Sequence, residues 1–372
     1  MELNNLSQSA GDNSTQMQAT TINNYYSTIS GIDEARAREI CKEEYAIARQ
    51  NWTSEATSIA DKRVHRLEDK LMPKMVAYDN TLKFFADPDF QFTLRRAQIS
   101  AASSERESDY EILSELLLHR VEQGCNRERR LGISKAIDVV NQITDEALIG
   151  LTMVYVVSKF IPTSNDLIVG LKVLNELYGN IINDCPFPSG DNWMEHLDLL
   201  SAIRLGTDGI NKFKKLNEYI PSQLSKYLVS GIENDSEKLI EIKKEFEQNN
   251  IPTNNIVDYP LKQNYVYLNL SFENIDHLEI TKEIGNGIAL RMPFNEQQKN
   301  VMKNAFPLIN KDESNNAILK KKLMEVWEKY TNLKNVKTWW DSLPCYFNIT
   351  PVGVALANAY AHNKAPNVPS LY

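Results

Sequence analysis

The chain has 372 residues, of which 42% are apolar and 24% are charged, and its formal net charge at pH 7 is −8. This composition is typical of a protein that buries a sizeable core, and the length favours two or three modules over one compact domain. The negative charge argues against general binding to nucleic acids or anionic membranes, because phosphate groups attract clustered lysine and arginine.

The first segment, residues 1–31, contains no lysine or arginine and is rich in Asn, Gln, Ser, Thr and Tyr. Such polarity favours an untethered tail. The lack of repelling charge and the Thr, Ile and Tyr residues also suit short strands that pair between identical chains, with ladders of Asn and Gln. We expect an oligomerisation leader whose contacts come from Thr15, Met17, Ala19, Thr21 and Ile22.

Residues 32–85 are expected to form a long amphipathic stalk helix. From Asp33 to about Met72 the sequence has neither glycine nor proline, and Pro73 would end the helix. Apolar residues recur about every 3.7 positions, which is typical of a nearly straight bundle and not of a leucine zipper. We expect the stalk to pack against its own chain or identical chains through Tyr45, Ala48, Trp52, Ile59 and Leu67.

Residues 86–250 predict a helical bundle. Asp87 before Pro88 is typical of a capped helix start, and Ser108 with Glu111 has the spacing of a capping box. Short loops that contain proline or glycine separate the amphipathic segments. The predicted helices cover residues 88–103, 108–124, 127–143, 145–160, 165–183, 192–205, 208–219, 222–230 and 236–248.

Residues 251–372 predict a mixed region. "NYVYLNLSF" alternates like a strand, Asn286-Gly287 favours a hairpin turn, and Thr350 with Pro351 predicts the start of the last helix. The expected fold class is therefore mainly α. It consists of a long N-terminal helix, a multi-helical bundle or array, a short N-terminal β leader and a small hairpin or sheet in the C-terminal part.

The sequence carries no contiguous catalytic motif. It lacks a G-x-x-x-x-G-K-[ST] loop, an H-E-x-x-H helix and a G-x-S-x-G elbow, and its five histidines lie apart. Whether the chain is an enzyme therefore stays open, and the lack of a motif favours a role without catalysis. The weak catalytic candidates are Asp184, Asp191, Glu195 and His196, which could form a general base if other residues converge on them.

The sequence shows no pattern that indicates a metal or another cofactor. It favours a cytoplasmic location. The four cysteines form no C-x-x-C pair, which fits a reducing compartment. The N-terminus lacks a basic segment followed by an apolar one, as a secretory signal would have. The most apolar run, "ALIGLTMVYVV", is shorter than a membrane span, so a membrane-disrupting role is a minor alternative.

Four landmarks together resemble a family of uncharacterised bacterial proteins: "GDNSTQMQATTIN", a long helix behind it, "DPDFQFTLRRAQ" with "LSELLLHRV", and "NITPVGVALANAYA". Members of the family open with a Gly-Asp-Asn-Ser strand-like leader, carry an Asp-Pro-Asp-Phe helix start and close with a Thr-Pro-Val-Gly helix. The resemblance implies no reaction. Similar leaders precede proteins suspected of roles in conflict with phages, which associates the chain with anti-phage defence.

Three functions are compatible with these patterns. The favoured one is a homo-oligomeric protein that assembles through its leader and stalk and senses or binds another macromolecule, such as a protein. The second is an enzyme or toxic effector with dispersed site residues near 184–198. The third is a membrane-disrupting effector that uses residues 147–160.

Overall fold

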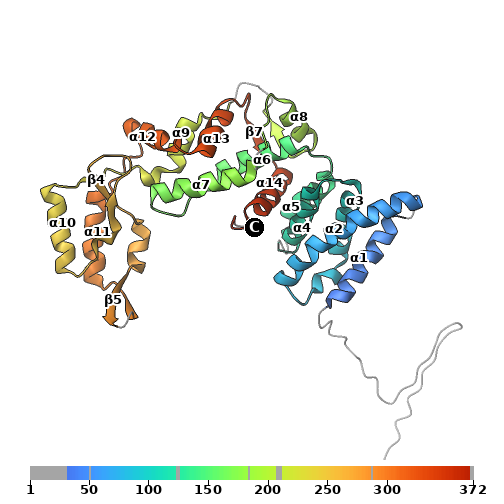
Figure 1. Cartoon of the computed structure of the whole chain (residues 1–372), viewed down its shortest axis with the longest axis horizontal. Coiled ribbons are helices and arrows are strands. Elements are labelled where there is room, and N and C mark those ends of the chain that lie inside the picture. The colour runs from blue at the N-terminus through green and yellow to red at the C-terminus, as the bar shows by residue number, and fades with distance from the viewer. Residues whose placement is uncertain are drawn as a thin grey trace, which may run out of the picture.

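The computed structural model describes residues 32–49, 52–122, 126–182, 185–206, 212–285 and 288–368. Figure 1 shows an arch, with the N-terminal helices at one end, a lobe of helices and small sheets at the other, and the C-terminal helix between them. The prediction of a mainly α fold with some antiparallel sheet in the C-terminal part is confirmed. The predicted leader, residues 1–31, lies outside the described residues.

The predicted unbroken helix from Asp33 to Met72 is wrong, because the segment forms two helices. These are α1 (Glu34–Ala48) and α2 (Ser54–Tyr78), and the Thr53 side chain caps the second by accepting a hydrogen bond from the backbone N–H of Ala56. Tyr45 and Trp52 meet edge to face across the break, with ring centroids 6.0 Å apart. The two helices fold back on one another, and both pack against the next helix of the chain.

Pro73 does not end α2 as predicted, but lies inside it. Proline in a helix interior removes one hydrogen bond and costs about 3 kcal/mol. Leu71, Met72 and Met75 are fully buried on either side of it. Burial of a large apolar side chain contributes about 1.5–3 kcal/mol, so tertiary packing outweighs the local penalty.

The next three helices complete the N-terminal bundle: α3 (Pro88–Ser103), α4 (Glu107–Glu122) and α5 (Arg127–Val139). Asp87 caps α3 as predicted, by accepting hydrogen bonds from the backbone N–H groups of Asp89 and Phe90. The predicted capping box at Ser108 is wrong, because that residue lies inside α4. Ser104 stabilises the turn before α4 instead, because its hydroxyl accepts a hydrogen bond from the backbone N–H of Arg106.

The middle of the chain forms the crown of the arch (Figure 1). Its elements are α6 (Asp145–Lys159), α7 (Leu167–Ile182), α8 (Asn192–Leu199), β1 (Ile203–Leu205), α9 (Leu216–Gln223) and the 3-10 turn η2 (Ser225–Tyr227). Three predicted helices are therefore wrong in part. Residues 203–205 form a strand, residues 212–215 precede α9 as irregular chain, and 222–230 contains only the end of α9 and a short turn. The strand β1 pairs antiparallel with β7 (Phe347–Ile349), which is distant in sequence.

Residues 232–309 form a lobe with a hydrophobic core of its own. Its three-stranded antiparallel sheet has the order β2 (Ile232–Glu233), β4 (Tyr265–Leu268), β3 (Ile256–Asp258). The predicted hairpin is present as the antiparallel pair β5 (Glu279–Gly285) and β6 (Ile288–Pro293), while its turn, residues 286–287, lies outside the described part. The helical elements of the lobe are α10 (Glu237–Gln248), η3 (Thr253–Asn255), η4 (Phe272–His277) and α11 (Glu296–Ile309).

The chain then returns to the centre of the arch through α12 (Ala317–Trp327) and α13 (Thr331–Asp341), and it ends with α14 (Pro351–Lys364). Thr350 caps α14 and Pro351 opens it, as predicted. The helix contacts α4, α5, α6 and α7, and its residues from Ala355 to Ala361 are buried. The last helix is therefore part of the core that the first half of the chain builds.

The apolar run at residues 147–157 belongs to this core, because every one of those side chains on α6 is buried. Within the described residues, no helix combines the length and the apolar character needed to cross a membrane.

At Gly353 the backbone of α14 lies close to the backbone of the crown of the arch. A Cβ atom at this position would lie 2.1 Å from the backbone carbonyl oxygen of Ala202. We expect Gly353→Ala to lower the free energy of unfolding by about 1–3 kcal/mol, because the backbone cannot move away as a flexible side chain would. Urea denaturation of the full chain measures this, with Asn363→Ala on the same helix as a control that stays within about 0.5 kcal/mol of wild type.

Candidate functional site

The predicted catalytic residues do not assemble a site that the structure describes. Asp191 and Glu195 are exposed on and before α8, and His196 is half-buried on the same helix. Asp184 lies outside the described residues. Asp191 occupies the N-cap position of α8, but its side chain accepts no capping hydrogen bond.

The predicted assembly residues divide between the chain's own core and its surface. Tyr45 and Leu67 are buried inside the chain, Trp52 is half-buried, and Ile59 is 54% exposed. Ala48 lies at the end of α1, and its side chain is not among those described. The leader residues Thr15, Met17, Ala19, Thr21 and Ile22 fall outside the described part of the chain.

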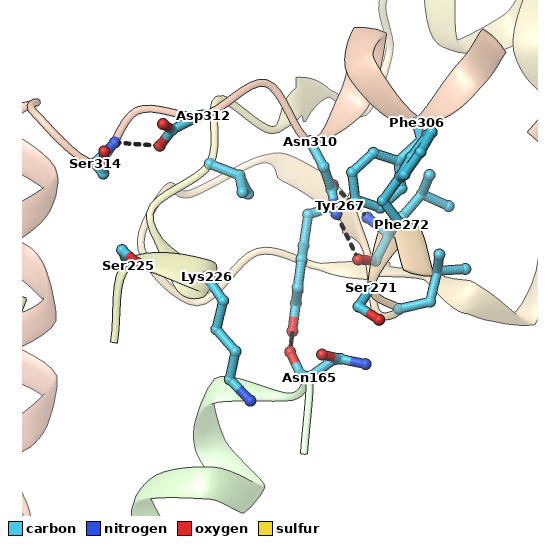
Figure 2. Close-up of a pocket in the computed structure, with 13 residues that line it drawn as sticks. Asn165, Ser225, Lys226, Tyr267, Ser271, Phe272, Phe306, Asn310, Asp312 and Ser314 are labelled. Atoms are coloured by element: carbon cyan, nitrogen blue, oxygen red, sulfur yellow. Dashed lines mark hydrogen bonds between the residues drawn. The ribbon is translucent and has the colours of Figure 1, made fainter. Parts of the chain in front are cut away.

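A pocket of about 330 Å³ opens where the C-terminal lobe meets the crown of the arch (Figure 2). Its lining comes from the loop before α7, from η2, from β4 and the turn after it, and from the end of α11 with the following loop. Four segments that are far apart in sequence therefore build its walls. None of the four was singled out by the sequence as a site.

Lys226 supplies the positive charge of the pocket. Its ammonium donates hydrogen bonds to the backbone carbonyl oxygens of Pro162 (2.6 Å) and Ser164 (2.8 Å) and lies 5.0 Å from the centroid of the Tyr227 ring. Although much of the side chain is exposed, partial burial of the ammonium lowers its pKa. An ammonium has three N–H donors, so one is left for a ligand.

No carboxylate among the described residues pairs with Lys226, and burial is the one cause of its lowered pKa. The carboxylate that lines the pocket belongs to Asp312, which accepts a hydrogen bond from the backbone N–H of Ser314 at 2.8 Å. Figure 2 shows Lys226 and Asp312 on the same side of the Tyr267 ring.

The opposite wall is aromatic. Phe272 and Phe306 meet edge to face with ring centroids 5.4 Å apart, and Figure 2 shows them on the far side of Tyr267 from Lys226. Phe272 is 50% exposed, so this wall presents apolar surface to the opening. A planar or apolar group would gain by covering that surface.

Tyr267 and Leu268 on β4 mark the boundary between two hydrophobic cores. Successive residues of a strand point to opposite faces. Tyr267 therefore joins the main core, whereas Leu268 joins the core of the C-terminal lobe. The Tyr267 hydroxyl donates a hydrogen bond to the backbone carbonyl of Asn165 (3.1 Å), and burial raises its pKa to about 12. The hydroxyl is thus a fixed, neutral donor that links the lobe to the loop before α7.

On the other side of the pocket, the Asn310 side chain forms two hydrogen bonds with the backbone of β4. Its amide oxygen accepts a hydrogen bond from the N–H of Leu268 (2.9 Å), and its amide nitrogen donates one to the carbonyl of the same residue (2.8 Å). The side chain thereby replaces a neighbouring strand along this part of β4, and it holds the end of α11 against the sheet.

Potential metal ligands gather elsewhere, between α4 and α14. They are Glu115, His119 and His362, whose ligand atoms all lie within 4.8 Å of one another. The spacing of Glu115 and His119 is a partial signal of this cluster, because the two are four residues apart on one predicted helix and so share a face. Only the packing of the last helix brings His362 to them.

Comparison with known families places the chain. A protein-family model described as ":-like" matches residues 31–371, which is most of the chain. The chain belongs to this family. The description names no reaction, ligand or partner, and no curated protein and no solved structure matches the chain significantly.

We expect Asn310→Asp to destabilise the C-terminal lobe. A carboxylate can accept a hydrogen bond from the Leu268 N–H but cannot donate one to the Leu268 carbonyl, and an unsatisfied buried acceptor costs about 1–3 kcal/mol. Urea denaturation of the full chain at neutral pH measures the loss. Asn304→Asp, at an exposed position of the same helix, is the matched control, and equal effects of the two substitutions would contradict the assigned role.

Proposed function

We propose that this protein is a binding protein that senses a small organic anion. The anion would bind in the pocket between the C-terminal lobe and the crown of the arch, which is lined by Lys226, Tyr267 and Phe272 and is called the junction pocket below. The observation that carries the proposal is the division of the pocket between a lysine without a carboxylate partner among the described residues and an aromatic wall formed by Phe272 and Phe306. A ligand with a carboxylate, sulfonate or phosphate at one end and a planar or apolar group at the other satisfies both walls.

The lining favours binding over catalysis. Asp312 is the one carboxylate among the lining residues, and the described lining has neither histidine nor cysteine. A hydrolytic or acyl-transfer site needs a nucleophile within reach of a base, or a pair of carboxylates with separate roles. In the described hydrogen bonds Lys226 donates to backbone carbonyls and not to a serine of the lining, so this arrangement of amides, hydroxyls, one ammonium and aromatic rings is suited to recognise a ligand.

The position of the pocket supports sensing. Its walls belong to both hydrophobic cores, since Tyr267 is part of the main core and Leu268 and Leu270 are part of the lobe core. A ligand held by Lys226 and Phe272 touches both bodies at once, so it stabilises one orientation of the lobe relative to the crown. Such differential stabilisation is what a ligand needs in order to shift a conformational equilibrium.

The fluorescent anion 1-anilinonaphthalene-8-sulfonate tests this pocket, because it joins a sulfonate to fused aromatic rings. We expect Lys226→Met to weaken its binding at least about tenfold, since a hydrogen bond to a charged group contributes about 1.5–3 kcal/mol. Fluorescence titration of the folded full-length protein gives the dissociation constant.

Lys262→Met is the matched control. Lys262 also donates to a backbone carbonyl, that of Ser230, lies 5.1 Å from the Tyr265 ring centroid and has a pKa lowered by burial. It does not line the pocket. An identical loss of dye affinity in the two variants would refute the assignment of Lys226 to the site.

We propose self-association as a second function, with the leader, residues 1–31, as the contact between copies of the chain. The helices that follow the leader expose apolar side chains: Ile47 and Ile59 are 50% and 54% exposed, and Phe92 on α3 is 55% exposed. We propose that several copies of the chain join through residues 1–31 and present their junction pockets together.

The free thiols of Cys41, Cys185 and Cys345 fit a reducing cytoplasm, and the resemblance of the leader supports a role in anti-phage defence.

We expect removal of residues 1–31 to lower the number of chains per particle in dilute buffer, which light scattering gives as the particle mass divided by the mass of one chain. The reason is that strands of the kind predicted from the sequence of residues 1–31 would pair their backbone edges with those of other copies. A variant with a Gly/Ser linker of equal length in place of the leader controls for chain length. An unchanged number of chains per particle in both variants would exclude the leader as the assembly element.

A further inference from the structure

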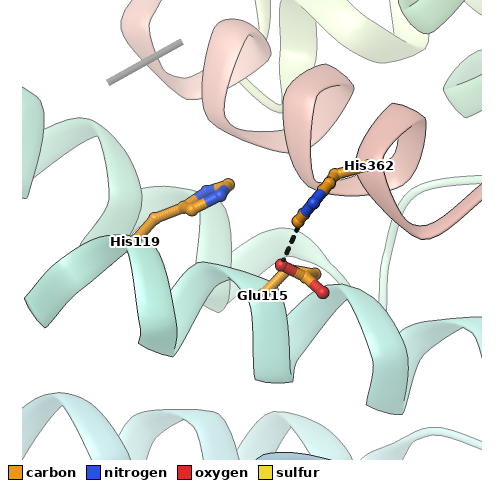
Figure 3. A group of neighbouring side chains, drawn as sticks. All are labelled: Glu115, His119 and His362. Carbon is orange, nitrogen blue, oxygen red and sulfur yellow. Dashed lines mark hydrogen bonds and ion pairs between the residues drawn. The ribbon is translucent and has the colours of Figure 1, made fainter. Parts of the chain in front are cut away.

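Three side chains that could bind a metal ion converge between the fourth helix and the last (Figure 3). Glu115 and His119 lie one turn apart on α4, and His362 reaches them from α14. The Nδ1 atom of His362 lies 3.0 Å from Oε2 of Glu115, and the two imidazole rings are stacked with centroids 6.4 Å apart. These residues are separate from the junction pocket and from the function proposed for it.

We propose that Glu115, His119 and His362 bind one divalent transition-metal ion, with Zn²⁺ as the best chemical match. Two imidazoles and a carboxylate are the donor set that suits Zn²⁺ in proteins. A tetrahedral Zn²⁺ ion lies about 2.0–2.2 Å from its ligand atoms and holds them about 3.3 Å from one another. The ligand atoms here lie within 4.8 Å of one another, so small side-chain rotations close the site.

Lys74 positions the carboxylate. Its ammonium lies 2.6 Å from Oε1 of Glu115 and 2.8 Å from the Ser114 hydroxyl, which leaves Oε2 directed at His362. The ammonium repels a dication, and Glu111, 3.3 Å from it, offsets that charge. Outer groups of this kind orient metal ligands and tune affinity.

Three protein ligands leave the fourth position of a tetrahedral ion for water. Glu115 and His119 are buried, whereas the side chain of His362 is 27% exposed, so an ion has access from the His362 side. The bound ion would tie the last helix to the N-terminal bundle at one point. We therefore expect it to stabilise the folded chain by mass action.

The test uses full-length protein without an affinity tag, stripped of metal with a chelator and then titrated with Zn²⁺ or Co²⁺ at neutral pH. We expect binding of one ion per chain and a rise in the melting temperature with Zn²⁺. Bound Co²⁺ should give the strong visible d–d bands of tetrahedral coordination without thiolate charge-transfer bands, because the site contains no cysteine. A wild-type Co²⁺ spectrum without tetrahedral bands overturns the proposal, whatever the variants do.

The variants are His119→Gln and Glu115→Gln, and each should weaken Zn²⁺ binding at least about 100-fold in calorimetric titrations. His65→Gln is the matched control, because His65 contacts Glu68 at 3.3 Å in the same manner but belongs to no group of three potential ligands among the described residues. We expect its Zn²⁺ affinity to equal that of wild type. Circular dichroism confirms that each variant is folded, and Zn²⁺ affinity unchanged in a folded Glu115→Gln variant overturns the proposal.

Discussion

Burial of the last helix is the constraint on which the rest of this structure depends. Val352, Leu356 and Tyr360 of α14 are buried, and the alanines between them let α4, α5, α6 and α7 approach its backbone closely. Each large apolar side chain buried in this way contributes about 1.5–3 kcal/mol. The N-terminal bundle thus completes its core only when the end of the chain has returned to it.

This return also explains the shape of the arch. Residues 232–309, between η2 and α12, build a second core, in which Phe246, Met302 and Ile309 are buried. Because β4 contributes alternate residues to the two cores, the boundary runs along a single strand. The junction pocket lies at that boundary, where neither core supplies enough side chains to fill the space.

Charged groups lie together at a second interface of the molecule, between the N-terminal helices and α14. Lys74 on α2, Glu115 on α4 and His362 on α14 form one continuous chain of contacts. Breaking a buried ion pair by removing one partner leaves an uncompensated charge and destabilises strongly. The same three helices therefore hold both the apolar core and a polar cluster with the donor types that metals require.

The sequence by itself determined the features that depend on near neighbours. Asp87, Asn295 and Thr350 cap helices because each side chain reaches backbone N–H groups two or three residues ahead. The antiparallel pairing of β5 with β6 likewise agrees with the hairpin predicted from the Asn286-Gly287 pair in the sequence. Tertiary structure decided the break before Thr53, the continuation of α2 through Pro73 and the strand at 203–205, because packing energies there exceed local propensity. Tertiary structure also decided both candidate sites: Asn165 meets Tyr267, and Glu115 meets His362, only after long loops have closed. Such contacts depend on how whole helices pack, which no short stretch of residues specifies.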